Sequence, residues 1–376
     1  MDLKLSNSVA NFAVKFYNEL EKNKTTICSP LSVEIALAML SLGCKNQSRA
    51  ELMTALDVPD DDALRISFSS LTSTLKSVRG VTLTIANKIY VIKNSELKPQ
   101  IQKDAEEVFE SSVEQLDFTD SKAAANTINE WVARKTNFLI KDIVSPAILH
   151  WVSSVIVNAI YFKGDWKIPF IKKLTKNKTF YVDERTTIEV PQMCAKGYFK
   201  YSVCPELKAR LLQMNYKGGD ANMIIVLPDD IEGLNYVLQL LKDGYDLLAD
   251  LAALKDTKLD VWIPKFKVET TIDLNKVLPK LGIKSIFSRV TSEIYMLASN
   301  ERLYVSTAVQ KAFIVVDETG TEAAASTAIM KRVIKRAKSN PVFNADRPFL
   351  YLLTARNILL FIGVYEGREY AQATYT

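Results

Sequence analysis

Residues 312–334 constrain the fold of this chain more than any other stretch, because they join a strand-like run to a long series of small residues. The run AFIVV at 312–316 is rich in the β-branched and aromatic residues that favour strands. As a strand, residues 321–330 would place Thr, Ala and Ile on one face and Glu, Ala, Ser and Met on the other. The same segment also suits a helix or an exposed loop, so it is compatible with two states.

The composition of the chain sets its broad class. With 376 residues, 48% hydrophobic and 24% charged, the chain can bury a large core, and composition alone leaves open one large domain or two. No apolar run reaches the roughly 18 residues of a membrane-spanning helix, and the first residues lack the apolar core of a cleavable signal. We therefore expect no membrane partner, and a cytoplasmic location or, for a mature secreted form, an extracellular one. The net charge of +5 is spread out without basic and aromatic interleaving, so we expect no nucleic-acid partner either.

Catalytic motifs are absent from the sequence. The chain has a single histidine, His150, and it contains no G-x-S-x-G elbow, no paired-histidine zinc motif and no phosphate-binding G-x-x-x-x-G-K-[ST] loop. A thiol dyad of Cys28 or Cys44 with His150 is the best remaining option, but we expect both cysteines in an apolar helix, where a thiolate is disfavoured. We therefore expect no enzyme, no catalytic residue, no metal and no cofactor.

The four cysteines do not form a disulfide framework. Cys28 and Cys44 flank a run that would be roughly 24 Å long as a helix, which is beyond disulfide reach. Cys194 and Cys204 could meet across a hairpin, but four cysteines in a chain of this length do not amount to a framework. We expect free thiols.

Several stretches have a clear periodicity. Residues 33–42 are apolar nearly all round and stop at Gly43, which predicts a helix buried in the centre of the molecule. Residues 82–92 alternate as a strand, and the run that starts at 151 begins as a strand covered on both sides with Asn158 buried within it. Near the end of the chain, two apolar runs separated by Arg-Asn predict a closing hairpin. Strands and helices are mixed along the chain.

Six stretches along essentially the whole chain resemble the serpin family, and two of them resemble insect serpins in particular. They are SPLSVEIALAMLSLG (29–43), INEWVARKTN (128–137), VNAIYFKGDWKIPF (157–170), IPKFKVETTIDLNKVLPKLGI (263–283), VQKAFIVVDETGTEAAAST (309–327) and FNADRPFLYLL (343–353). The resemblance implies an α+β serpin fold in a single domain, 1–376, with three β-sheets, eight or nine helices and an exposed reactive-centre loop at about 318–341.

The resemblance also implies a suicide-substrate inhibitor of serine or papain-like cysteine proteases. A protease would cut the loop and stay acyl-linked to it while the loop inserts into the main sheet. The segment expected to act as the hinge of this insertion carries small residues and no proline, as in inhibitory serpins. Its residues are Glu318, Gly320, Thr321, Glu322, Ala323, Ala324 and Ala325. The alternative is a non-inhibitory serpin that acts as a binding, carrier or chaperone protein.

The position of the cut is predicted from loop length. Counting seventeen residues from Glu318, as the family's usual loop implies, places the reactive bond between Ile334 and Lys335. An elastase-like enzyme accepts Ile334, and a papain-like enzyme reads the preceding apolar residue, Val333. Two dibasic pairs flank this bond and would attract trypsin-like or processing proteases. They are Lys331-Arg332 and Lys335-Arg336.

By resemblance, a buried polar network should hold the sheet where its strands part. Ser29, Ser32 and Asn158 match that network, and Trp166 matches the aromatic residue at the end where insertion begins. At Gln310 the chain departs from the family, because many members carry a histidine there, and this argues against a pH-sensitive network through that residue. The expected partner is a target protease, and the expected state is a monomer.

Overall fold

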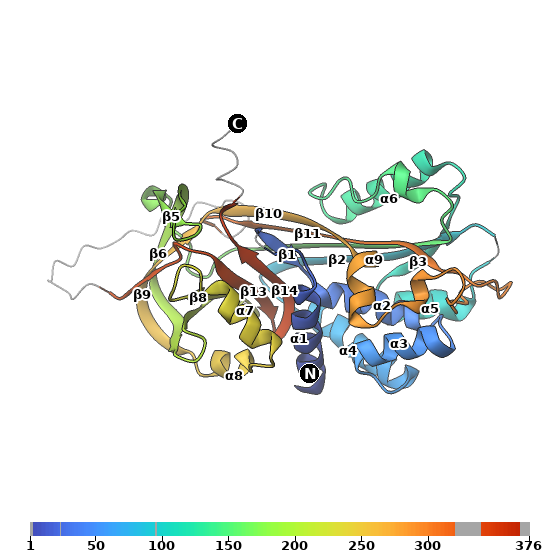
Figure 1. Cartoon of the computed structure of the whole chain (residues 1–376), viewed down its shortest axis with the longest axis horizontal. Coiled ribbons are helices and arrows are strands. Elements are labelled where there is room, and N and C mark those ends of the chain that lie inside the picture. The colour runs from blue at the N-terminus through green and yellow to red at the C-terminus, as the bar shows by residue number, and fades with distance from the viewer. Residues whose placement is uncertain (1–2, 23, 95, 320–339, 369–376) are drawn as a thin grey trace.

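The structure is a computed structural model that describes residues 3–22, 24–94, 96–319 and 340–368, with side chains from residue 8 onward. Strands form two sheets, and helices lie on both faces of the smaller one (Figure 1). The described part has the α+β architecture that the resemblance implied, with nine α-helices and mixed sheets. None of the described helices is long and apolar enough to cross a membrane.

The smaller sheet has five strands, in the order β10-β11-β4-β2-β3. They are β10 (Phe266–Asp273), β11 (Val305–Val316), β4 (Ser154–Gly164), β2 (Val81–Ile92) and β3 (Ser112–Leu116). β11 and β4 run parallel at its centre, whereas β10 pairs with β11, and β2 with β4, in antiparallel fashion. β4 is buried along almost its whole length, as its continuous apolar run predicted.

The larger sheet has nine strands in two halves that share β6 (Thr187–Cys204). β5 pairs with the first six residues of β6, β9 with the residues from Gln192 to Tyr201, and β7 with the last five. Because β6 runs through both halves, the three sheets that the resemblance implied are joined into two among the described strands. The other strands are β1 (Thr26–Cys28), β5 (Lys176–Tyr181), β7 (Ala209–Asn215), β8 (Ala221–Pro228), β9 (Lys255–Pro264), β12 (Val342–Asn344), β13 (Phe349–Ala355) and β14 (Ile358–Tyr365).

The helix α2 (Pro30–Ser41) runs through the centre of the molecule, and every one of its residues is buried. It starts at the N-cap Ser29 with Pro30 in the first turn, a common arrangement because proline lacks the N–H that a first turn leaves unpaired. The other helices are α1 (Leu3–Asn18), α3 (Asn46–Leu56), α4 (Asp61–Lys76), α5 (Pro99–Glu107), α6 (Ser121–Lys135), α7 (Leu234–Lys242), α8 (Leu247–Ala252) and α9 (Leu274–Val277). Short 3₁₀ helices are η1 (Pro146–Leu149), η2 (Lys172–Leu174), η3 (Leu278–Leu281) and η4 (Ser285–Phe287).

The five-stranded sheet separates two apolar clusters. On one face Ile156 and Ile160 of β4 join the main core with α2, and on the other Val155 and Val157 pack with α6. Because alternate residues of a strand point to opposite faces, β4 contributes to both. Figure 1 shows α6 as a separate layer over the sheet, on the side away from α2.

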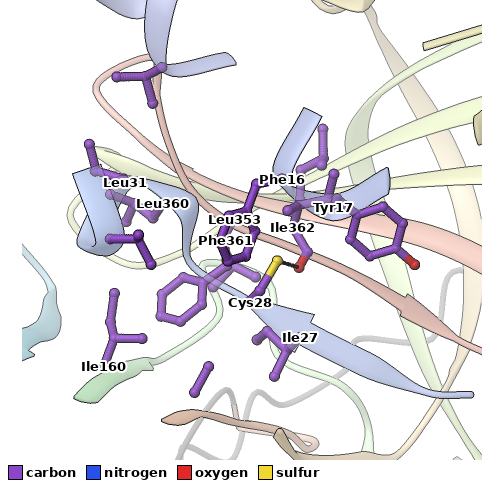
Figure 2. Packing of buried hydrophobic residues seen from close by; sticks show 14 of the residues in the cluster. Phe16, Tyr17, Ile27, Cys28, Leu31, Ile160, Leu353, Leu360, Phe361 and Ile362 are labelled. Atoms are coloured by element: carbon purple, nitrogen blue, oxygen red, sulfur yellow. Dashed lines mark hydrogen bonds between the residues drawn. The ribbon is translucent and has the colours of Figure 1, made fainter. Parts of the chain in front are cut away.

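Cys28 lies inside the main core, in β1 rather than in the apolar helix expected from the sequence. Figure 2 shows it among Phe16, Leu31 and Phe361, where its thiol donates a 3.5 Å hydrogen bond to the carbonyl oxygen of Ile362. Burial raises its pKa, which leaves the thiol protonated at neutral pH.

The other cysteines and the histidine also differ from a catalytic arrangement. Cys44 follows α2, and Cys194 and Cys204 both lie on the single strand β6, so no hairpin brings these two together. All four are free, buried thiols, as predicted. His150 is an exposed residue that directly follows η1.

Candidate functional site: the seam between β4 and β11

The site predicted from the sequence falls on the boundary between β4 and β11, which we name the seam. Its parallel ladder runs from the pair Val305–Ser154 to the pair Phe313–Tyr161. Beyond that pair both strands continue for three residues, but they remain paired only to their outer neighbours β10 and β2. The seam is therefore closed along its ladder. Its two strands separate at the end where β4 and β11 finish, which we call the upper end of the seam.

Gln310 of β11 and Asn158 of β4 lie opposite each other in the middle of the seam, and both are fully buried. The Nε2 of Gln310 donates to the Oδ1 of Asn158 at 2.7 Å and to the carbonyl oxygen of Ser29 at 2.8 Å. Its Oε1 accepts from the backbone N–H of Ser29 at 2.9 Å. One glutamine side chain therefore joins both strands to the start of α2.

Ser32 and Asn87 complete this central network. The Nδ2 of Asn158 lies 2.8 Å from the carbonyl oxygen of Ser32 and 2.6 Å from its hydroxyl, and it also contacts the Oδ1 of Asn87. Asn87 in turn donates from its Nδ2 to the carbonyl oxygen of Ser32 at 3.1 Å. Ser29 caps α2 by accepting from the N–H of Ser32, and its hydroxyl donates to Leu360. All five side chains are neutral amides or hydroxyls, so none titrates near neutral pH.

Trp166 lies just beyond the end of β4, where the seam opens. Its ring is 1% exposed and stacks on Tyr216 with centroids 4.4 Å apart. Its indole Nε1 donates to the carbonyl oxygen of Asp317 at 2.9 Å. Its backbone N–H donates to the carbonyl oxygen of Thr319, also at 2.9 Å. A third bond of 2.9 Å joins the N–H of Phe170 to the carbonyl oxygen of Glu318. The segment after β11 is thus held along the segment after β4.

Glu318 has a buried carboxylate at this upper end. It accepts from the Nζ of Lys265 at 2.8 Å and from the hydroxyl of Thr175 at 3.0 Å. Burial alone raises the pKa of this carboxyl, but these hydrogen bonds favour the charged form and bring its pKa below the ordinary value. The first residue of the predicted hinge is therefore fixed by charge-assisted contacts.

The structure brings together most of the predicted residues that it describes. Ser29, Ser32 and Asn158 meet in the middle of the seam, whereas Trp166 and Glu318 both lie at its upper end, where Trp166 bonds to the residues on either side of Glu318. The other predicted residues lie outside the described residues. They are Gly320, Thr321, Glu322, Ala323, Ala324 and Ala325 of the hinge and Lys331, Arg332, Val333, Ile334, Lys335 and Arg336 around the predicted cut.

Sequence reasoning missed Asn87, Thr175 and Lys265 as members of the site. Asn87 left a usable signal, because it is an uncharged polar residue inside a strand whose neighbours are mostly apolar. Thr175 and Lys265 are ordinary surface residue types in their own segments, and only the folded chain brings them to Glu318.

This arrangement suits a conformational change rather than catalysis. The strands β4 and β11 are joined by a backbone ladder and, in its middle, by a layer of side-chain hydrogen bonds, and a strand placed between them would pair with both. Within the described residues no cluster of His, Cys, Asp and Glu could hold a metal ion.

Comparison with known proteins gives a family match over nearly the whole chain. Residues 7–366 match the sequence model of the family described as Serpin (serine protease inhibitor). The chain is 38% identical over 367 residues to a protein of Bombyx mori named antitrypsin, covering 96% of this chain and 93% of that protein.

Two solved structures resemble this one in fold. Serpin48 of the insect Tenebrio molitor, described as a highly specific serpin, has 32% identity and a TM-score of 0.87, covering 97% of this chain and 98% of its own. Human thyroxine-binding globulin has 27% identity and also a TM-score of 0.87, covering 96% of this chain and 98% of its own. The same fold therefore occurs in proteins with differently named roles.

Proposed function

The chain belongs to the serpin family, and we propose that it is a suicide-substrate inhibitor of a serine or papain-like cysteine protease. The protease attacks the loop that follows Glu318, and its nucleophile forms an acyl bond to the residue before the cut. The freed arm then inserts at the seam as a sixth strand and carries the protease with it. Distortion of the oxyanion hole stops deacylation, so enzyme and inhibitor stay covalently joined.

The observation that carries this proposal is the five-stranded sheet with β4 paired directly to β11. The upper end of this seam is the point from which the loop departs, since Asp317 and Thr319 bond to Trp166 there. An arm starting at Thr321 would enter the sheet at the end where β4 and β11 no longer pair. The insertion thus begins where no ladder hydrogen bond must first be broken.

Insertion releases enough free energy to deform a bound enzyme. The arm from Thr321 to Ile334 would span roughly 46 Å as a strand. Its residues would gain ladder hydrogen bonds of about 1 kcal/mol net each, on the order of 10 kcal/mol in all. The sequence places small residues on the face that turns inward first, and no proline interrupts the arm before Pro341.

A second candidate function is that of a non-inhibitory binding, carrier or chaperone protein. The observation that favours it is the fold shared with thyroxine-binding globulin, at 27% identity. The small residues of the hinge argue for the inhibitor, because an arm that never inserts has no need of them.

A denaturing gel separates the two functions. The protein is mixed with a panel of serine and cysteine proteases, and an inhibitor gives an adduct near the summed masses with at least one of them. Mass analysis of the released carboxyl-terminal peptide gives the cut, for which we propose the bond Ile334–Lys335. The matched control is Thr321→Arg, which places a charged side chain on the inward face and should turn the protein into a substrate that is cut without an adduct. Nicking of the unaltered protein by every protease without any adduct would exclude the inhibitor.

A further inference from the structure

Glu34 is a buried carboxyl group in the second turn of α2, with no part in the central network. The side chain is 2% exposed, and its Oε2 has no hydrogen-bond partner among the described atoms. A charged carboxylate in such a place is very costly, so the group is held as the neutral acid. Burial raises the pKa of Glu34 well above its ordinary range.

No charged neighbour offsets this burial. The elements packed against α2 are α1, α3, α4, β2, β4 and β14. Their charged side chains, within the described residues, are Lys15, Arg49, Glu51, Asp61, Asp62, Arg65, Lys76, Lys88 and Lys163. Their tyrosines are Tyr17, Tyr90, Tyr161 and Tyr365. Several of the charged groups are paired elsewhere, such as Arg65 with Asp104 and Lys88 with Glu114, and burial is the only cause of the raised pKa.

Glu34 lies in the part of α2 that holds the seam closed. Ser29 and Ser32, whose contacts reach both β11 and β4, precede it by five and two residues. The carbonyl oxygen of Ser29 also accepts the N–H of Val33, next to Glu34. A movement of this end of α2 that brings Glu34 to water would therefore also pull Ser29 and Ser32 away from the seam.

We propose that Glu34 is a proton-controlled latch of the seam. While its carboxyl group is protonated, the first turns of α2 stay packed and Ser29 and Ser32 hold β4 to β11. When it ionises, the turn moves toward water and the seam opens more readily. The central network contains no titratable group, so it has no pH sensor of its own, and Glu34 supplies one from the same helix that carries Ser32.

The sign of the pH dependence follows from the direction of the pKa. Below about pH 4.3, the ordinary pKa of Glu, the closed and open states are both protonated, and pH does not favour either. Above it only the closed state keeps the proton, so the equilibrium constant for opening rises about tenfold per pH unit until the closed-state pKa is passed. The closed seam is thus most stable in mild acid and loses stability as the pH rises.

The test compares the unaltered protein with Glu34→Gln, which keeps the shape and cannot ionise, between pH 5.5 and 7.5. One readout is the thermal midpoint of the uncut protein, and the other is the rate at which it converts, without protease, to a form resistant to heat. The conversion rate rests on the proposed function, whereas the thermal midpoint does not. If loop insertion fails, only the conversion is lost, and the midpoint still tests the latch.

We expect the midpoint of Glu34→Gln minus that of the unaltered protein to grow with pH by about 2 °C per unit. The conversion rate of the unaltered protein should rise with pH, and that of the variant should stay constant. Glu184→Gln, at an exposed carboxylate, is the matched control and should behave like the unaltered protein. If Glu34→Gln does not fold, Glu34→Leu replaces it. Equal pH dependence in the unaltered protein and the Glu34 variant would overturn the proposal, as would the absence at pH 7 of an infrared carbonyl band from a protonated Glu34.

Discussion

The middle and the upper end of the seam hold the same two strands together by different means. In the middle, Asn158 and Gln310 are fully buried and bond through neutral groups to Ser29 and Ser32. At the upper end the strands no longer pair, and Glu318 is held by the ammonium group of Lys265, the hydroxyl of Thr175 and the backbone N–H of Phe170.

This difference in hydrogen bonding indicates which part of the seam resists opening and which part opens more easily. Breaking the middle leaves several buried polar groups without partners at once, whereas at the upper end the half-exposed ammonium group of Lys265 can exchange its contact with Glu318 for water. An inserting strand should therefore meet its main barrier at the level of Asn158 rather than at Trp166.

Asn158→Ala should lower the free energy of unfolding of the uncut protein the most. It removes the amide that contacts Ser32 and Asn87 and leaves Gln310 with one partner fewer. Loss of a buried hydrogen-bonded group of this kind costs about 3 kcal/mol in the free energy of unfolding. Urea unfolding of the uncut protein measures it, with Asn177→Ala, at an exposed site on β5, as the control. A change below about 1 kcal/mol would mean that the network is not the barrier.

Gln310→His should have the second largest effect on the free energy of unfolding, and this effect should depend on pH. Burial lowers the pKa of a histidine at this position, so the neutral form is favoured in the folded state. The stability is then fully present above the unfolded pKa of about 6.5 and falls by about 1.4 kcal/mol per pH unit below it. Thermal midpoints at pH 5.5 and 7.5 test this. A pH profile like that of the unaltered protein would contradict a buried, closed seam at Gln310.

Lys265→Ala should lower the free energy of unfolding the least of the three variants. The lysine side chain is 46% exposed, so solvent screens its bond to Glu318 and its loss should cost less than about 1 kcal/mol. The depressed pKa of Glu318 gives stability that is present above about pH 4.3 and is lost in stronger acid. In Lys265→Ala, the free energy of unfolding measured by urea should therefore fall less between neutral pH and acid than in the unaltered protein. A loss as large as that of Asn158→Ala would reverse the ranking of the two regions.

Much of the fold could be predicted from local patterns. The helix α2 and the strand β4 were predicted because long apolar runs bounded by Gly43 and Gly164 leave few alternatives. The hairpin of β13 and β14 was predicted from two apolar runs around Arg356 and Asn357. By contrast Cys28 was expected in a helix, because the three residues of β1 are too few to show a strand period.

The site could be predicted only in part. Resemblance supplied Ser29, Asn158 and Trp166, and the structure gives each a set of partners. Glu34 and Lys265 were not predicted, because their roles depend on contacts between segments far apart in the chain. A glutamate inside an apolar helix run is nevertheless a signal that sequence alone contains.

The account depends on a sheet that can take in one more strand, and the most direct test is a crystal structure of the protein after its loop has been cut. We predict a six-stranded sheet in which a strand beginning at Thr321 separates β11 from β4, so that Gln310 and Asn158 no longer pair. A cut protein in which β11 still pairs with β4, with Gln310 opposite Asn158, would contradict the account.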